Sequence, residues 1–239
     1  MSLGPRHICD TFWVTITQPI FLGAILGFNP LTKVNDPKSK VSLASGPFIM
    51  IKHTIFNKVG GYESIKGHIA DDIGLAKLIK MSGFKLRFVN AQSLICLRMY
   101  KQFGDIWEGW SKNSFLGFIQ KQEIQSKFLQ VLVLLAGIFA IVDILILPFL
   151  SMIITVSLVF FLQSAVWINF LVFVCITWLV SIVSLMCVQR LYYFGKTRYV
   201  PLTLSLDGFI VLGIFINSAF QTLSGRGVTW KGRRYYDER

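Results

Sequence analysis

The feature that most constrains this chain is an apolar stretch, residues 128–189, which contains no lysine or arginine and one acidic residue, Asp143. A stretch of about 60 residues is long enough for two to three membrane crossings at about 20 residues each. Pro148 and the polar pair Gln163-Ser164 are natural breaks within it. We therefore expect transmembrane helices at residues 128–147, 148–163 and 165–186.

A fourth apolar stretch, residues 201–223, precedes a basic tail. Because Lys and Arg collect on the cytoplasmic flanks of spanning helices, the soluble half and the tail are both expected in the cytoplasm, which requires an even number of crossings. Four crossings satisfy this but leave the basic loop at residues 189–200 outside. Two crossings with re-entrant helices are the competing solution. We expect four, in an integral protein of the cell membrane.

The composition agrees with a membrane protein. Lys and Arg number 24 against 12 Asp and Glu, a formal net charge of +12, and 54% of the residues are hydrophobic. Soluble domains are about 45–50% apolar. No basic stripe interleaves with aromatic residues on a soluble segment, so we expect membrane lipids, and not nucleic acid, as partners of the positive charge. The cysteines and histidines are scattered without zinc-ligand spacing.

The chain before the apolar stretch begins with a lead-in and a loop. Residues 12–28 are apolar but short, and they are interrupted by polar residues and Pro19. Since a full span needs about 20 apolar residues, an interfacial or re-entrant segment is expected there. Residues 29–40 form a polar loop rich in turn-forming residues.

The segment from residue 46 to residue 70 begins with a turn at Gly46-Pro47. The apolar residues 48–51 that follow are expected to form a buried strand. Residues 54–59 are expected to form a short helix that ends at Gly60-Gly61, because tandem glycine suits a turn with positive φ.

Residues 71–81 have the apolar spacing of a helix, with Lys77 and Lys80 toward solvent. Residues 84–88 alternate between apolar and basic side chains, which is the period of a strand. Together with the preceding residues, the order is strand, helix, helix, strand. We therefore expect a mixed α/β half-domain before the apolar helices.

The acidic pair Asp71-Asp72 opens the helix at residues 71–81. Neighbours on a helix point in different directions, so one carboxylate can face a cleft while the other caps the helix or forms an ion pair. A carboxylate in a partly apolar cleft is a candidate general base, because its pKa rises toward the working pH. The alternative is that the helix dipole alone favours two acids at this position.

An aromatic and polar cluster lies shortly before the first apolar helix, and it comprises Trp107, Glu108, Trp110, Lys112 and Asn113. Tryptophan is common in sugar-binding sites, where it offers a flat apolar face and a hydrogen-bond donor. It is equally common at membrane interfaces. Both interpretations remain open for this cluster.

Among the polar residues within the apolar stretches are Asp143, Asn169, Asp207 and Asn217. Such residues are costly in lipid and should face protein or water. They could line a substrate path, as in a small transporter, or hold neighbouring helices together. No inverted repeat supports a transporter.

Taken in order, the chain shows a Gly-Pro-Phe strand, a Gly-Gly turn, an acidic pair that opens a helix, a basic strand, Arg98-Met99-Tyr100, a Trp-rich helix and apolar spans. This order resembles the second half of a membrane-bound family-2 glycosyltransferase of the GT-A type. The nearest branch includes ceramide glucosyltransferase-like and carotenoid glycosyltransferase-like enzymes. The resemblance covers residues 35–113, and the ending at residues 225–233 also resembles that branch.

The resemblance implies roles for particular residues. Asp72 would be the catalytic base that deprotonates an acceptor hydroxyl, with Asp71 as its neighbour. The family's Gln/Arg-x-x-Arg-Trp motif falls at residues 106–110, where Trp110 matches but Gly109 occupies the position of the arginine. The residues implied to contact substrate are Gly46, Pro47, Gly60, Gly61, Tyr62, Arg98, Trp107 and Trp110.

The family's donor-binding half precedes this segment and carries an Asp-x-Asp motif for a divalent metal. This chain has no Asp-x-Asp. We therefore expect that the chain alone binds no cofactor, that Mg²⁺ or Mn²⁺ belongs to the complete family enzyme, and that a separate donor-binding polypeptide is a candidate partner.

The expected fold is a partial α/β GT-A domain followed by an all-α bundle of transmembrane helices. We expect a lead-in at residues 1–34, the acceptor-side half at 35–127, about four transmembrane helices at 128–224 and a basic cytoplasmic tail at 225–239. The expected function is sugar transfer from a nucleotide-sugar to a lipid or lipid-linked acceptor, by a hexosyltransferase that lacks its donor half. The alternatives are a non-catalytic membrane protein, either a remnant or a subunit of a split transferase, and a small transporter.

Overall fold

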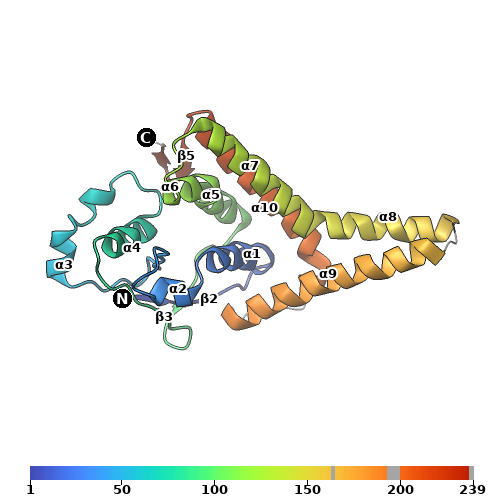
Figure 1. The fold of residues 1–239 in the computed structure, drawn as a ribbon, viewed down its shortest axis with the longest axis horizontal. Coiled ribbons are helices and arrows are strands. Elements are labelled where there is room, and N and C mark those ends of the chain that lie inside the picture. The colour runs from blue at the N-terminus through green and yellow to red at the C-terminus, as the bar shows by residue number, and fades with distance from the viewer. Residues whose placement is uncertain (163–164, 193–199, 237–239) are drawn as a thin grey trace.

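The computed structural model describes residues 1–162, 165–192 and 200–236. Helices and short strands form a mixed part at one end, and long apolar helices project from it at the other (Figure 1). The elements in chain order are β1 (Ser2–Gly4), β2 (Arg6–His7), α1 (Phe12–Phe28), α2 (Leu31–Asn35), α3 (His53–Lys58), a 3₁₀ turn (Glu63–Ile65), α4 (Asp71–Met81), β3 (Phe88–Asn90), β4 (Cys96–Leu97), α5 (Phe103–Asn113), α6 (Phe115–Lys121), α7 (Lys127–Ile141), a π-helical turn (Val142–Ile146), α8 (Leu147–Leu162), α9 (Ala165–Tyr192), α10 (Val200–Leu223), β5 (Val228–Trp230) and β6 (Arg233–Tyr235).

The strands pair across large separations in the sequence. β1 runs parallel to β3, with Ser2 opposite Phe88, and β2 runs parallel to β4, with Arg6 opposite Cys96. β5 and β6 form an antiparallel hairpin at the C-terminal end. The first residues of the chain therefore belong to the mixed part, although residues 1–34 were expected to be a lead-in.

Two predicted strands differ from those observed. Residues 48–51 form only an isolated antiparallel bridge, from Ile49 to Ser2. In the described part of the chain no strand lies on the other side of this segment, so nothing extends the pairing. The strand expected at residues 84–88 begins at Phe88 instead. Its predicted alternation still appears in the burial, because Leu86 and Phe88 are buried and Lys85 is exposed.

The helix α4 has the bounds that the sequence predicts, residues 71–81. Its buried face comprises Gly74, Leu75, Ala76 and Ile79. Lys77 and Lys80 were expected to face solvent, but both reach other segments. Lys77 Nζ donates to the Glu123 carboxylate at 2.6 Å, and Lys80 Nζ donates to the Val34 and Val41 carbonyls at 2.7 and 2.6 Å. Their long side chains thus tie α4 to neighbouring loops.

The helix α1 packs inside the mixed part. Val14, Ile16 and Phe21 are buried in a cluster with residues of α5 and α10. Only its ends resemble an interfacial segment, where Phe12 and Phe28 are 48% and 70% exposed. Because α1 supplies part of the core, it supports the helix α5 that follows the predicted site.

The apolar residues form long helices. Two stretches are long and apolar enough to cross a membrane by length and composition: Lys127–Phe161, which runs through α7 and α8 and has 35 residues, and Leu206–Leu223 within α10, which has 18 residues. A break was expected at Pro148, but the helix continues past it after the π-helical turn. Prolines and π-turns are common causes of bends in helices, which accounts for the bend between α7 and α8 (Figure 1).

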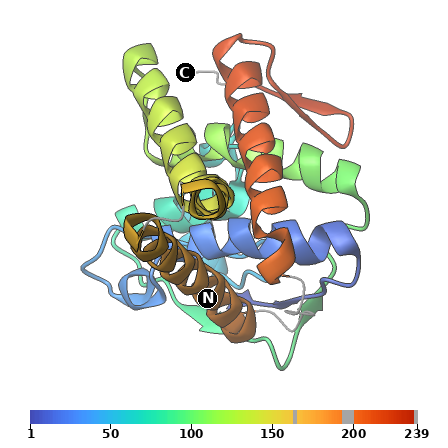
Figure 2. The same ribbon diagram turned by 90° about the vertical axis from the view of Figure 1, so that its right-hand side faces the viewer.

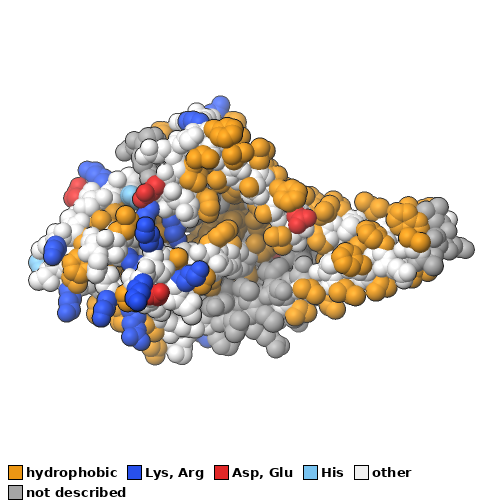
Figure 3. Space-filling view, in the orientation of Figure 1, with side chains coloured by type: hydrophobic (Ala, Val, Ile, Leu, Met, Phe, Trp, Pro, Cys, Tyr) orange, Lys and Arg blue, Asp and Glu red, His pale blue; other side chains and the backbone are white. Residues whose placement is uncertain are grey.

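The helices α8 and α9 form a projecting antiparallel pair, and α10 packs along α7 and across α5 (Figure 2). On the face shown in Figure 3, hydrophobic side chains are frequent on the described part of the projecting pair, whereas Lys and Arg gather on the mixed part. An apolar surface of this kind is typical of a segment that contacts lipid. Four crossings and their orientation remain predictions.

Candidate active site

The start of α4 positions the acidic pair. Asp72 Oδ2 accepts a hydrogen bond from the Gly46 backbone N–H at 2.8 Å, and Asp72 Oδ1 accepts one from the Ile73 N–H at 2.8 Å. Asp71 Oδ1 accepts from the Asp72 N–H at 3.0 Å. Asp71 thus lies on the exposed side of the helix start, while the half-buried Asp72 faces the turn at Gly46. The role of Asp72 as a base remains a prediction.

The groups around Asp72 change the pKa of its carboxyl in opposite directions. Burial raises the pKa of its carboxyl above the ordinary value, and the charge of Asp71 raises it further. The two backbone donors and the positive charge of Lys112 lower that pKa. The net effect is a raised pKa, and a change in this direction makes a carboxylate a better proton acceptor.

Lys112 extends from α5 toward the C-terminal hairpin. Its ammonium lies 4.9 Å above the ring of Tyr235 in β6. Burial lowers the pKa of Lys112, and the charges of Asp71 and Asp72 oppose that change. Lys112 is therefore a half-buried cation beside the hairpin.

A cavity of about 560 Å³ lies beside α4 and opens to solvent. Its walls are mostly apolar and include Ile49, Ile51 and Leu75. Polar groups come from Asp72, Lys52 and Lys85, which lie at its edge. Asp72 of the acidic pair is therefore accessible to a molecule in this cavity.

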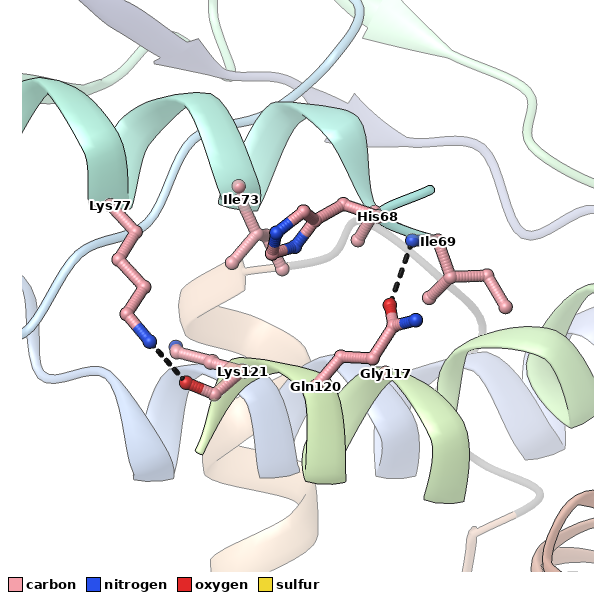
Figure 4. A pocket seen from close by; sticks show the side chains of 9 residues that line it. His68, Ile69, Ile73, Lys77, Gly117, Gln120 and Lys121 are labelled. Carbon is pink, nitrogen blue, oxygen red and sulfur yellow. Dashed lines mark hydrogen bonds between the residues drawn. The ribbon is translucent and has the colours of Figure 1, made fainter. Parts of the chain in front are cut away.

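A second, much smaller hollow lies between α4 and α6 (Figure 4). Its volume of about 10 Å³ suffices for about one water molecule. Around it, Gln120 Oε1 accepts from the Ile69 N–H at 2.9 Å, and Lys77 Nζ donates to the Lys121 carbonyl at 2.8 Å. These hydrogen bonds connect α4 and the loop before it to α6. The hollow between them is too small for a substrate.

The structure brings only some of the predicted site residues to Asp72. Gly46 and Pro47 form the turn beside it, and a Cβ at residue 46 would lie 3.2 Å from Asp72 Oδ2. Gly60 and Gly61 instead form the turn after α3, with φ values of 79° and 58°. The ring of Tyr62, 52% exposed, contacts the edge of Phe56 with ring centroids 5.6 Å apart. Substrate contact by these last three residues remains a prediction.

The aromatic and basic residues that were predicted to contact substrate contact other residues of the fold instead. Trp110 is 2% exposed, stacks on Phe21 with ring centroids 4.4 Å apart, and donates from Nε1 to Gln18 Oε1 at 3.0 Å. Trp107 packs toward α10, where a Cβ at Gly213 would lie 3.0 Å from its ring. Arg98 forms an ion pair with Asp10 at 2.6 Å. Substrate contact by these three residues also remains a prediction.

The structure explains the glycine in the predicted motif. A Cβ at residue 109 would lie 2.3 Å from Tyr100 Oη and 2.6 Å from its Cε1. Tyr100 is itself 2% exposed. Gly109 is thus required by packing, and an arginine cannot occupy this position without displacing the tyrosine.

Lys112 was not among the predicted site residues, although its charge acts on both members of the acidic pair. It belongs to the Trp-rich cluster. Its contact with the ring of Tyr235 joins segments far apart in the sequence, so it depends on tertiary packing, which no local pattern reveals.

A divalent metal held by the protein alone needs several carboxylate, imidazole or thiolate ligands close together. In residues 1–162, 165–192 and 200–236, no three His, Cys, Asp or Glu side chains group closely enough to hold one. Both oxygens of Asp72 also accept backbone hydrogen bonds.

Comparison with known proteins gives one family. A family model described as glycosyl transferase family 21 matches residues 33–237. The matched range includes α4, α5, the long apolar helices and the β5–β6 hairpin. No curated protein and no solved structure matches the chain.

Proposed function

The chain belongs to glycosyl transferase family 21, and on this basis we propose that it takes part in transfer of a sugar from a nucleotide-sugar to a lipid or lipid-linked acceptor at a membrane. The observation that carries the proposal is Asp72, a half-buried carboxylate at the start of α4 that lines a cavity. The apolar helices provide the membrane attachment that a lipid acceptor requires.

The chemistry assigned to Asp72 is general base catalysis. Its carboxylate accepts the proton of an acceptor hydroxyl as the hydroxyl oxygen attacks the anomeric carbon. The new bond joins that oxygen to the anomeric carbon, and the bond between the anomeric carbon and the diphosphate breaks. The nucleoside diphosphate leaves with the bonding electrons. Attack from the face opposite the leaving group inverts the configuration at the anomeric carbon.

A donor-binding partner is the second part of the proposal. The described residues supply no metal-binding cluster, and the sequence has no Asp-x-Asp. The edge of residues 48–51 that faces away from β1 has no strand beside it among the described residues. We therefore propose that the nucleotide-sugar, with any Mg²⁺ or Mn²⁺, is held outside the described residues, with a separate donor-binding polypeptide as the candidate, and that this chain binds the acceptor hydroxyl.

One polar residue of the spans, Asn217, has a structural role, which does not favour the transporter alternative. Asn217 Nδ2 in α10 donates to Ser111 Oγ in α5 at 3.0 Å, so this side chain links two helices. Such a link is the structural role that the sequence also allows.

The test is incorporation of label from a panel of radiolabelled nucleotide-sugars into lipid extract. Membranes would carry this chain alone, or this chain with the product of the open reading frame immediately upstream. Asp72→Asn removes the base and keeps the size of the side chain, and we expect transfer to fall by about 10²-fold or more, as for the loss of a general base. Asp71→Asn is the matched control, because it changes the neighbouring charge and leaves the base in place.

The proposal is supported if transfer needs both polypeptides and is lost in Asp72→Asn but not in Asp71→Asn. Transfer by this chain alone contradicts the assignment of the donor to a partner. Equal loss in Asp71→Asn and Asp72→Asn contradicts the role of Asp72 as the base. No transfer in any combination leaves a non-catalytic membrane protein as the function.

A further inference from the structure

Residues 48–51 lie along one edge of β1, whose other edge pairs with β3. The Met50 N–H donates to the Met1 carbonyl at 2.8 Å, and the Phe48 carbonyl accepts from the Leu3 N–H at 3.2 Å. The backbone groups of residues 48 and 50 are therefore directed toward β1. In an extended segment the groups of successive residues point to opposite edges.

The backbone groups of Ile49 and Ile51 consequently point away from β1. No backbone hydrogen bond to these groups occurs among residues 1–162, 165–192 and 200–236. A sheet edge with free N–H and C=O groups is a template for the backbone of another strand. An extended polypeptide fits the spacing of Ile49 and Ile51, because its own backbone groups repeat every two residues.

The same two isoleucines contribute to the wall of the cavity of about 560 Å³ beside α4. Leu75 and Ile79 of α4 contribute further apolar surface, and Asp72 lines the same cavity. A strand added to this edge would border the cavity and remove apolar surface of Ile49 and Ile51 from water, which is favourable. The added strand would also lie on the side of the cavity that is shared with Asp72.

Two lysines flank this edge. Lys52 follows it directly in the sequence, Lys85 lines the same cavity, and both are exposed. In the described part of the chain neither side chain forms an ion pair. A second copy of this chain would bring the same positive charges to the edge, and lysines on an edge strand oppose such self-pairing. An acidic strand would instead be attracted.

The position of the edge argues for a partner outside the membrane. The helix α3, which follows residues 48–51, lies with α4 at the end of the molecule opposite the projecting pair α8 and α9 (Figure 1). A bilayer around the projecting pair would therefore not cover this edge. A polypeptide fits the free backbone groups, the apolar wall and the positive charges together.

We propose that the edge at residues 49–51 is the docking site for a strand of the donor-binding polypeptide, with acidic residues of that strand beside Lys52 and Lys85. The inference rests on the proposed function, in which the nucleotide-sugar is held outside the described residues. The strand borders the cavity that Asp72 lines. Docking therefore brings the donor to the side of the cavity where the acceptor hydroxyl loses its proton.

Cross-linking tests where the partner binds. A benzophenone amino acid replaces Met50, which is 56% exposed, in the full chain in membranes that also carry the product of the open reading frame immediately upstream. Met81, 68% exposed and outside the cavity, is the matched control position. We expect irradiation to join residue 50, and not residue 81, to the upstream product.

The substitution Ile51→Pro tests the backbone pairing. Proline removes the outward N–H and is tolerated on a strand edge whose N–H faces solvent. Ile51→Ala is the matched control, because it shortens the side chain and keeps the N–H. With equal Tm in detergent, we expect Ile51→Pro to bind the upstream product on the order of 10-fold more weakly than Ile51→Ala, since a carbonyl of the partner loses its donor.

A charge reversal tests the acidic partner without a change in the backbone. Lys52→Glu with Lys85→Glu should weaken binding of the upstream product, and the binding should depend less on salt than in the unsubstituted chain. Lys38→Glu with Lys40→Glu is the matched control, because both residues are exposed and lie outside the cavity. This control should bind like the unsubstituted chain.

The inference is overturned if residue 50 is joined to a second copy of this chain, or to the upstream product no more than residue 81 is. It is also overturned if folded Ile51→Pro and Ile51→Ala bind equally, or if the two lysine pairs behave alike.

The two proposals fail in different ways. Binding at the edge without sugar transfer in any preparation would refute the proposed function and support the docking site. Transfer that needs both polypeptides but is equal in Ile51→Pro and Ile51→Ala would support the function and refute the docking site.

Discussion

The substitution Gly109→Ala tests how α5 packs beneath the site. The added Cβ would lie 2.3, 2.6 and 2.7 Å from Oη, Cε1 and Cζ of Tyr100, all closer than van der Waals contact allows. Tyr100 cannot move freely, because its ring meets Trp110 and Trp230 at centroid distances of 6.3 and 6.1 Å. Overpacking of this kind costs about 1–3 kcal/mol.

Gly104→Ala on the same helix is the matched control, because a Cβ at residue 104 meets nothing within 4 Å. Both substitutions gain up to about 1 kcal/mol from the higher helix propensity of alanine. The overpacking therefore appears as the difference between them, and Gly109→Ala should be less stable than Gly104→Ala by about 1–3 kcal/mol. In a chain of this size that corresponds to roughly 2–4 °C in Tm per kcal/mol.

The assay is thermal unfolding in detergent followed by tryptophan fluorescence, which reports on the buried ring of Trp110. A double variant, Gly109→Ala with Tyr100→Leu, removes the atoms that the Cβ would meet. We expect it to be more stable than the sum of the single variants predicts, by about 0.5–3 kcal/mol. A Gly109→Ala chain as stable as Gly104→Ala would refute this account of why residue 109 is glycine.

Two further predictions concern residues outside α4. Burial lowers the pKa of His7 from 6.5 to about 4. Between these pH values the unfolded chain binds a proton at His7 that the folded chain does not bind. Stability should therefore fall as the pH falls from 6.5 to about 4. The decline of the unfolding free energy between pH 7 and pH 5, measured by urea unfolding, should be smaller in His7→Gln than in the unsubstituted chain. His53→Gln is the control and should decline like the unsubstituted chain. Equal declines in all three chains would contradict the role of His7. Arg98 and Asp10 form a pair whose side chains are 43% and 42% exposed, so Arg98→Gln should change the free energy of unfolding by less than about 1 kcal/mol. Loss of sugar transfer in Arg98→Gln without a change in Tm would assign Arg98 to substrate binding, whereas unchanged transfer would exclude that role.

The local features of this chain were predictable where the chain's own spacing determines them. The helix at residues 71–81 has an apolar face, two acids at its start and Gly83 after its end, and the structure has it at those residues. The turn at Gly60-Gly61 follows from the need for positive φ. The apolar runs predict long helices because they carry almost no charge.

The errors of prediction arose where a strand or break depends on distant neighbours. Residues 48–51 have the composition of a strand, yet a strand requires a partner along its length, and β1 provides one bridge. A proline such as Pro148 usually interrupts a helix, yet here the helix continues past it after the π-helical turn. Local composition does not contain this information.

The sequence by itself therefore determined the α4 helix, its acidic pair and the apolar helices, because each depends on residues that are close together in the chain. The tertiary structure alone decided which distant residues meet. Trp110 donates to Gln18, 92 residues away, the Lys231 N–H donates to Glu108, 123 residues away, and the Gly46 N–H donates to Asp72, 26 residues away. The physical reason is that these contacts are selected by the packing of whole helices, which depends on the shape and burial of many side chains together.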